Sequence, residues 1–150
     1  MKRFVLLPLA LLLLGAADPK DEAVRKEQKK LAGKWVLVEA VVDGKKVPAE
    51  VVQKGHLVHR GDETTLVTPH QSGEPIKAKS KLDPTTTPKR VDWVRSQGPG
   101  AGKTIQAIYE WDGDDKYRVC FDPSGKERPK EFVSKPGSGH ILHVWKRATK

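Results

Sequence analysis

The sequence predicts an all-β protein: an eight-stranded antiparallel up-and-down barrel with a short helix before its first strand. Beyond Gly33, short runs with alternating apolar and polar residues are separated by turn residues. The connections are mostly tight, and tight turns join neighbouring antiparallel strands. Eight such strands would leave two unpaired edges in an open sheet, and closing the sheet into a barrel removes both edges.

Residues 1–17 have the layout of a cleavable signal peptide. Two basic residues precede an apolar run from Phe4 to Leu14, and small residues at 15–17 offer a cleavage point before Asp18. The apolar run is too short to span a bilayer as a stable helix. We therefore expect a secreted or periplasmic protein with no transmembrane segment after signal cleavage.

The mature chain divides into a polar N-terminal segment, residues 18–30, and one barrel domain, residues 31–150. Apolar residues in the polar segment recur at helical spacing up to Leu31, so we expect a short helix that starts near Asp21. The remaining length suits one domain with a core of its own, without metals or cross-links.

The first three strands are predicted around two hairpin turns. Trp35 to Val42 ends at Asp43-Gly44, a dipeptide typical of tight hairpins. His56 to Arg60 and Thr64 to Thr68 then flank the turn at Gly61-Asp62. We expect these runs to pair in antiparallel order.

The fourth strand is predicted from strict alternation over Ile76 to Leu82, in which every second residue is a lysine. Such a pattern is typical of a half-buried strand with one solvated face, and we favour this interpretation over a basic binding stripe. Arg90 to Arg95 follows as the fifth strand, after a connection that contains Pro84 and Pro88.

The last three strands are separated by glycine-containing turns. They are predicted at Thr104 to Trp111, Lys116 to Phe121 and His140 to Arg147. The run Asp122-Pro123-Ser124-Gly125 after the seventh strand has Pro and Gly at the positions that a type I turn favours.

Gly33-Lys34-Trp35 at the first strand and Arg147 in the last strand resemble the lipocalin pattern. In lipocalins an N-terminal tryptophan packs beneath a C-terminal arginine at the closed end of the barrel, so the resemblance implies that Gly33, Trp35 and Arg147 close this barrel. A stacked guanidinium–indole pair contributes about 0.5–2 kcal/mol.

A wider set of motifs is similar to an uncharacterised secreted lipocalin-like domain family of planctomycete-type bacteria. The motifs occur in this order: Leu31-Ala32-Gly33-Lys34-Trp35, Asp43-Gly44-Lys45, Leu82-Asp83-Pro84, Pro88-Lys89, Asp92, Ile108-Tyr109-Glu110, Cys120, Arg128-Pro129, Phe132 and Lys146-Arg147. The resemblance implies a lipocalin-like barrel and export, and it supplies no activity.

Two motifs that suggest phosphate or calcium binding are incomplete. The stretch Gly98 to Thr104 looks like a phosphate-binding loop, but Gln97 occupies the position of its first glycine and a strand follows in place of a helix. The cluster from Asp112 to Asp115 lacks the glycine of a calcium loop, since Tyr117 stands at the sixth position. We interpret both as inter-strand turns.

The histidines and the single cysteine form no local catalytic motif. His56 with His59, and His140 with His143, have a three-residue spacing that sends the members of each pair to opposite faces of a strand, although one from each pair could meet across the barrel. Cys120 has no disulfide partner and is expected to be a buried structural thiol. We expect no enzyme activity, no catalytic or metal-ligating residues and no cofactor.

Aromatic residues on the predicted strands are the ligand-binding candidates. They are Trp93, Tyr109, Trp111 and Tyr117, with Arg95 as an anchor for an anionic group. Aromatic faces lining a barrel would suit a small apolar or amphipathic molecule. The alternative is that the side chains fill the interior themselves.

The formal charge of +9 favours anionic partners. Export makes nucleic acid the least expected of them. Two functions therefore remain: a monomeric binding module for a small apolar ligand, or a cell-envelope interaction module whose basic surface contacts an anionic polymer or another protein. The size of the interior cavity distinguishes them, because a solid core would leave only the second.

Overall fold

Two helices and nine strands form within residues 15–68 and 74–149, the part of the chain that the computed structural model describes. In chain order they are α1 (Pro19–Leu31), β1 (Gly33–Val42), β2 (Lys45–Lys46), α2 (Ala49–Val52), β3 (His56–Arg60), β4 (Glu63–Val67), β5 (Ile76–Asp83), β6 (Lys89–Gln97), β7 (Thr104–Trp111), β8 (Lys116–Phe121) and β9 (Ile141–Arg147). The apolar run of the predicted signal peptide lies outside the described residues.

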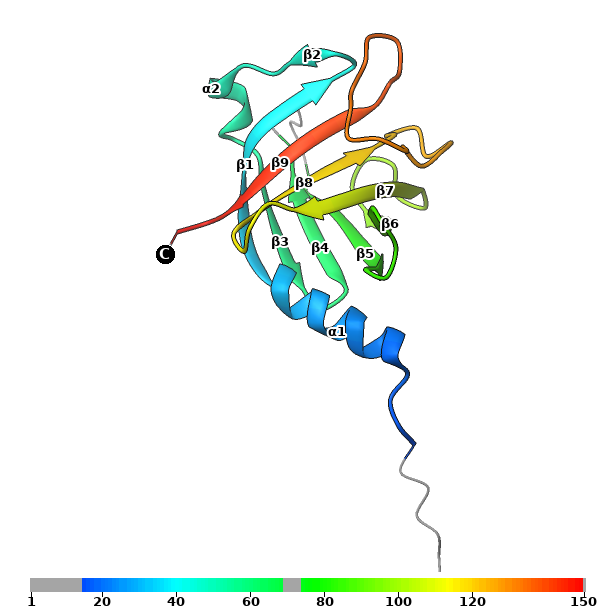
Figure 1. Ribbon diagram of the computed structural model, residues 1–150. Coiled ribbons are helices and arrows are strands. Elements are labelled where there is room, and N and C mark those ends of the chain that lie inside the picture. Colours follow the sequence, from blue (N-terminus) through cyan, green and yellow to red (C-terminus); the bar gives the residue numbers. More distant parts are fainter. Residues whose placement is uncertain (1–14, 69–73, 150) are drawn as a thin grey trace, which may run out of the picture.

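The predicted eight-stranded antiparallel barrel is confirmed. β1 and β3 to β9 pair with their neighbours in chain order, and β1 also pairs with β9, which closes the sheet (Figure 1). All eight predicted strands are present, and each of their ends lies within about two residues of the expected position. Closure leaves no long unpaired edge on the barrel itself.

The turn at Asp43-Gly44 forms the expected hairpin and also contacts a distant segment. Both residues have positive φ angles, 48° and 79°, as a two-residue hairpin turn requires. The Gly44 N–H donates to Ser134 Oγ at 3.0 Å, and the Gly139 N–H donates to Asp43 Oδ1 at 2.9 Å. This turn therefore anchors the long connection between β8 and β9.

The two-residue strand β2 and the one-turn helix α2 were not predicted from the sequence. β2 continues the hairpin for two residues, with Val41 opposite Lys46 and Val42 opposite Lys45. α2 follows Pro48 and buries Val52 against the barrel. Neither element is long enough to give a periodic pattern that sequence analysis can detect.

α1 covers one end of the barrel (Figure 1). It begins at Pro19, slightly earlier than expected, because the side chain of Asp18 accepts a hydrogen bond from the Lys20 N–H at 2.8 Å and caps the helix. Glu27 and Leu31 are its buried residues. No helix in residues 15–68 and 74–149 is long and apolar enough to cross a membrane.

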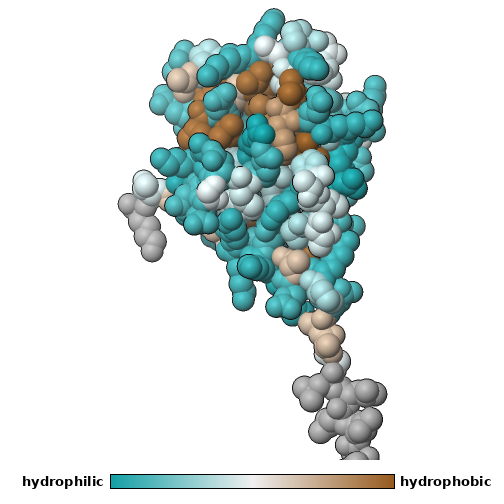
Figure 2. All heavy atoms as spheres, in the orientation of Figure 1, coloured by the Kyte–Doolittle hydropathy of each residue, from teal (hydrophilic) through white to brown (hydrophobic). Residues whose placement is uncertain are grey.

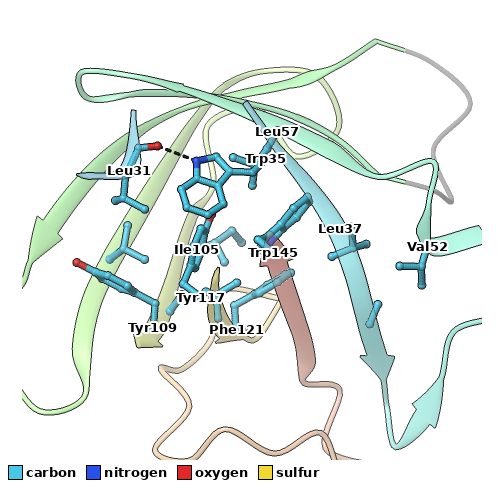
Figure 3. Packing of buried hydrophobic residues seen from close by; sticks show 14 of the residues in the cluster. Leu31, Trp35, Leu37, Val52, Leu57, Ile105, Tyr109, Tyr117, Phe121 and Trp145 are labelled. Carbon is cyan, nitrogen blue, oxygen red and sulfur yellow. Dashed lines mark hydrogen bonds between the residues drawn. The ribbon is translucent and has the colours of Figure 1, made fainter. Parts of the chain in front are cut away.

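The buried aromatic residues lie inside the barrel along its axis. Figure 3 shows Trp35, Tyr117 and Trp145 at the centre of this cluster, with Tyr109 toward one side. The inner face of β1 stays continuous because a bulge between Leu37 and Glu39 restores the inward direction. The buried cluster therefore combines aromatic side chains with aliphatic ones such as Leu37 and Leu57.

The outer wall is mostly polar, but hydrophobic residues gather on it near the end opposite α1 (Figure 2). Among the described residues the exposed large hydrophobic side chains are Val38, 46% exposed, and Val133, 40% exposed. Lys77, Lys79 and Lys81 lie on the exposed face of β5, as the alternation predicted.

Candidate functional site

Arg147 and Trp35 join the first and last strands to the end of α1. The Trp35 indole is fully buried and its Nε1–H donates to the carbonyl oxygen of Leu31 at 2.8 Å (Figure 3). The guanidinium carbon of Arg147 lies 4.4 Å from the centre of the Trp35 ring. Arg147 also donates to the carbonyl oxygens of Lys30 and Ala32, at 2.9 and 3.1 Å. A cation bound to the last carbonyls of a helix stabilises its C-terminus.

A buried carboxylate binds α1 to the barrel beside this pair. Glu27 Oε1 accepts hydrogen bonds from Trp111 Nε1 at 2.7 Å, from the Tyr109 hydroxyl at 3.0 Å and from Lys89 Nζ at 3.0 Å. Burial, and then the charge of Glu27, raise the pKa of Tyr109, so the phenol stays protonated and donates. This end of the barrel is therefore closed by satisfied polar contacts.

The opposite half of the barrel holds a cavity of about 270 Å³ that opens to solvent. Its wall is largely apolar and comes from the inward positions of all eight barrel strands except β7. The lining residues are Ala40, Val42, Leu57, His59, Thr64, Leu66, Thr68, Ile76, Ala78, Trp93, Arg95, Tyr117, Val119, Phe121, Pro123, Ile141, His143 and Trp145. Many of them lie at strand ends remote from α1, so the mouth faces away from the helix.

The deep part of the cavity has a chain of hydrogen-bonded polar side chains. Hydrogen bonds join Ser80 Oγ to Thr64 Oγ1 at 2.8 Å, Thr64 Oγ1 to His59 Nδ1 at 2.8 Å, and His59 Nε2 to the Tyr117 hydroxyl at 3.1 Å. Burial lowers the pKa of His59 to about 4, so its imidazole is neutral at ordinary pH. A neutral chain of this kind adds hydrogen-bonding capacity to the wall without adding charge.

Arg95 is the one permanently charged side chain among the described residues that line the cavity. Its Nη1 donates to the carbonyl oxygen of Pro99 at 3.0 Å. In residues 15–68 and 74–149 no carboxylate forms an ion pair with it, and burial lowers the pKa of its guanidinium. The cavity thus carries one positive charge that the described chain does not neutralise.

The structure separates the five candidate ligand residues into two groups. Trp93, Arg95 and Tyr117 line the cavity, and the Trp93 ring meets that of Phe121 edge-on with 5.7 Å between the ring centres. Tyr109 and Trp111 do not lie on its wall; they bind Glu27 at the closed end. All five point inward, so alternation alone could not tell which end of the barrel each would reach.

Thr64 and Trp145 line the cavity but were not singled out in the sequence, and His59 was considered only as one of a histidine pair. All three point inward because they alternate with exposed or half-exposed neighbours on β3, β4 and β9. The alternation of apolar and polar residues in each strand indicated these inward positions. The sequence did not show which distant strands pair, and this pairing brings the three side chains into one cavity.

Cys120 is buried, as expected, but it lies outside the barrel interior. On β8 the inward residues are Tyr117, Val119 and Phe121, so Cys120 points to the outer face. The connection between β8 and β9 covers it there, and its Sγ lies 3.7 Å from the carbonyl oxygen of Val133. Burial raises the pKa of the thiol, which keeps it protonated. The predicted buried thiol therefore lies between the outer face of β8 and the connection that covers it.

The histidine pairs split as the strand geometry predicted. His59 and His143 line the cavity, whereas His56 and His140 are not among the lining residues. Within the described ranges no group of three His, Cys, Asp or Glu side chains is placed to hold a metal ion. The glycine-rich stretch 98–102 joins β6 to β7 as an inter-strand loop.

No protein-family model, curated protein or solved structure matches this chain. The resemblance to the secreted lipocalin-like family therefore stays a prediction that rests on its motifs.

Proposed function

We propose that this protein is an exported, monomeric binding module that holds a small apolar or amphipathic molecule in the cavity of its barrel. The cavity itself carries the proposal: about 270 Å³ of open space behind a largely apolar wall. An apolar cavity of about 150 Å³ suffices to bind benzene, so this one has room for about eleven non-hydrogen atoms. Membership in the secreted lipocalin-like family is part of the proposal, and the closed barrel supports it.

The distribution of polar groups favours binding over catalysis. The deepest polar side chains, His59 and Thr64, are hydrogen-bonded to each other and to Tyr117 and Ser80. A nucleophile needs a base that is itself oriented by a third group, and the described wall has no carboxylate to do so. The wall is therefore suited to enclose a ligand by shape and apolar contact.

The envelope-interaction alternative receives less support from the structure. A solid interior would have favoured it, whereas the barrel has room for a ligand. The lysines of β5 alternate with buried residues, as in any strand with one solvated face.

Titration with 1-octanol, whose size suits the cavity, tests the proposal. Isothermal titration calorimetry at several temperatures should show one site with a negative heat-capacity change, because binding removes apolar surface from water. Ala78→Phe would place a ring in the cavity and should weaken binding at least tenfold. Ala49→Phe, at an exposed position of α2 outside the cavity wall, is the matched control and should bind like the wild type. Equal binding by both variants, or no binding by the wild type, would contradict the proposal.

A further inference from the structure

We infer that the ligand is a carboxylic acid with an apolar chain of about eight to ten carbons and one negative charge. Its carboxylate binds Arg95 at the mouth, and its chain occupies the cavity. This inference rests on the proposed function and names the ligand class of the same cavity. Three features of the structure support it: the unpaired charge, the loop that positions Arg95 and the single sign of charge on the wall.

The first feature is the unneutralised guanidinium on an apolar wall. Arg95 shares the cavity surface with Trp93, Phe121 and Ile76, so part of its hydration is replaced by apolar contact. Partial burial of a charge without a counter-ion is unfavourable, and an opposite charge bound nearby offsets that cost. The guanidinium has five N–H donors in a planar fork, of which one bond, to Pro99, is made within the described chain. The remaining donors suit the two oxygens of a carboxylate.

The second feature is the glycine-rich loop that joins β6 to β7. Backbone hydrogen bonds join the Arg95 N–H to the Lys103 carbonyl at 2.9 Å and the Gly102 N–H to the Arg95 carbonyl at 2.8 Å. Gly100, with a φ of 76°, comes so close to Arg95 that a Cβ there would lie 2.7 Å from Nη1. A side chain at position 100 would displace the guanidinium, and glycine permits both the turn and the close approach.

The third feature is the charge of the rest of the wall. Apart from Arg95, the described lining residues include no Lys, Asp or Glu, and His59 is neutral. The one permanent positive charge of the described wall matches one negative charge. The length of the ligand follows from the cavity volume, since an eight-carbon carboxylate has ten non-hydrogen atoms, close to the roughly eleven that the space admits.

The experiment compares sodium octanoate with 1-octanol, which has the same chain without the charge. At pH 7.5 and low salt, calorimetric titrations are run on the wild type and on Arg95→Gln. We expect the substitution to weaken octanoate binding at least tenfold, as loss of a charge-assisted hydrogen bond does, and to change octanol binding less than twofold. Arg95→Lys, which keeps the charge but not the fork, should be intermediate for octanoate.

A pair of glycine variants tests the role of the loop. Gly100→Ala puts a methyl group against Arg95 Nη1, whereas Gly102→Ala, with a φ of 87°, has nothing within 4 Å of the new methyl group. Both variants carry similar backbone strain. Octanoate binding should weaken in Gly100→Ala and remain near the wild-type value in Gly102→Ala.

The outcomes separate the two proposals. If octanol binds but octanoate binds equally well to wild type and Arg95→Gln, the ligand class is wrong and the binding function stands. If neither compound binds to the wild type, both proposals are wrong. Octanoate binding that depends on Arg95 and Gly100, with octanol binding that does not, supports both.

Discussion

Trp35 should stabilise the pairing of β1 with β9, the two strands that close the barrel, so its removal should lower the stability of the fold. The side chain is fully buried, its Nε1–H binds Leu31, and its ring centre lies 4.9 Å from that of Tyr117. Burial of a tryptophan removes about 150–250 Å² from water, so Trp35→Ala should lower the free energy of unfolding by about 4 kcal/mol. Arg147→Ala removes the stacked guanidinium and its bonds to the helix carbonyls, and should cost about 2 kcal/mol.

The two substitutions should be non-additive because Arg147 stacks on the ring that Trp35→Ala removes. Urea unfolding followed by circular dichroism gives the four free energies of the cycle, and we expect a coupling of about 1 kcal/mol. Arg118 is a matched control, since its guanidinium also lies 4.4 Å from an aromatic ring centre, that of Phe132. Arg118→Ala and Trp35→Ala should be additive. Additivity of Trp35→Ala with Arg147→Ala, within about 0.3 kcal/mol, would show that the contact between these two side chains does not stabilise the closed barrel.

Three further predictions concern individual buried groups. Glu27→Ala leaves the Tyr109 phenol and the Trp111 indole without their acceptor, so it should lower the free energy of unfolding in urea by about 2 kcal/mol. The control Glu22→Ala, on the exposed side of α1, should change it by less than about 0.5 kcal/mol. Cys120 should react with a thiol reagent only after denaturation, and rapid labelling of the folded protein would show that the covering connection opens. The unfolded chain protonates His59 near pH 6.5 but the folded chain only near pH 4, so the free energy of unfolding should fall as pH drops between these values, by up to roughly 3 kcal/mol. His59→Gln should lack this fall in the free energy of unfolding. If the pH dependence of His59→Gln equals that of the wild type, the prediction is wrong.

The strands could be predicted from the sequence because their signals are local. Alternation over 76–82 and the Asp43-Gly44 dipeptide depend only on nearby residues, and both elements formed as expected. The start of α1 differed by two residues because the cap at Asp18 lets the helix begin at Pro19. Local patterns were therefore sufficient for the architecture.

The positions of side chains along the barrel axis depend on contacts between distant segments. Tyr109 was expected to line a ligand site with Trp93, but Glu27 of α1 holds it at the closed end. The burial of Cys120 on the outer face of β8 could not be predicted without knowing that the connection between β8 and β9 covers it. The orientation of Arg95 likewise depends on the fold of its glycine-rich loop, which the sequence predicted only as an inter-strand turn.

The most direct test of the account is a crystal structure of the protein with 8-bromooctanoate, whose bromine can be located by anomalous scattering. We predict one bromine peak inside the barrel, near Trp145 and His59, with the carboxylate at Arg95. Bromine on the outer wall, or a cavity that stays empty at saturating ligand, would contradict the claim that this barrel is a ligand-binding site.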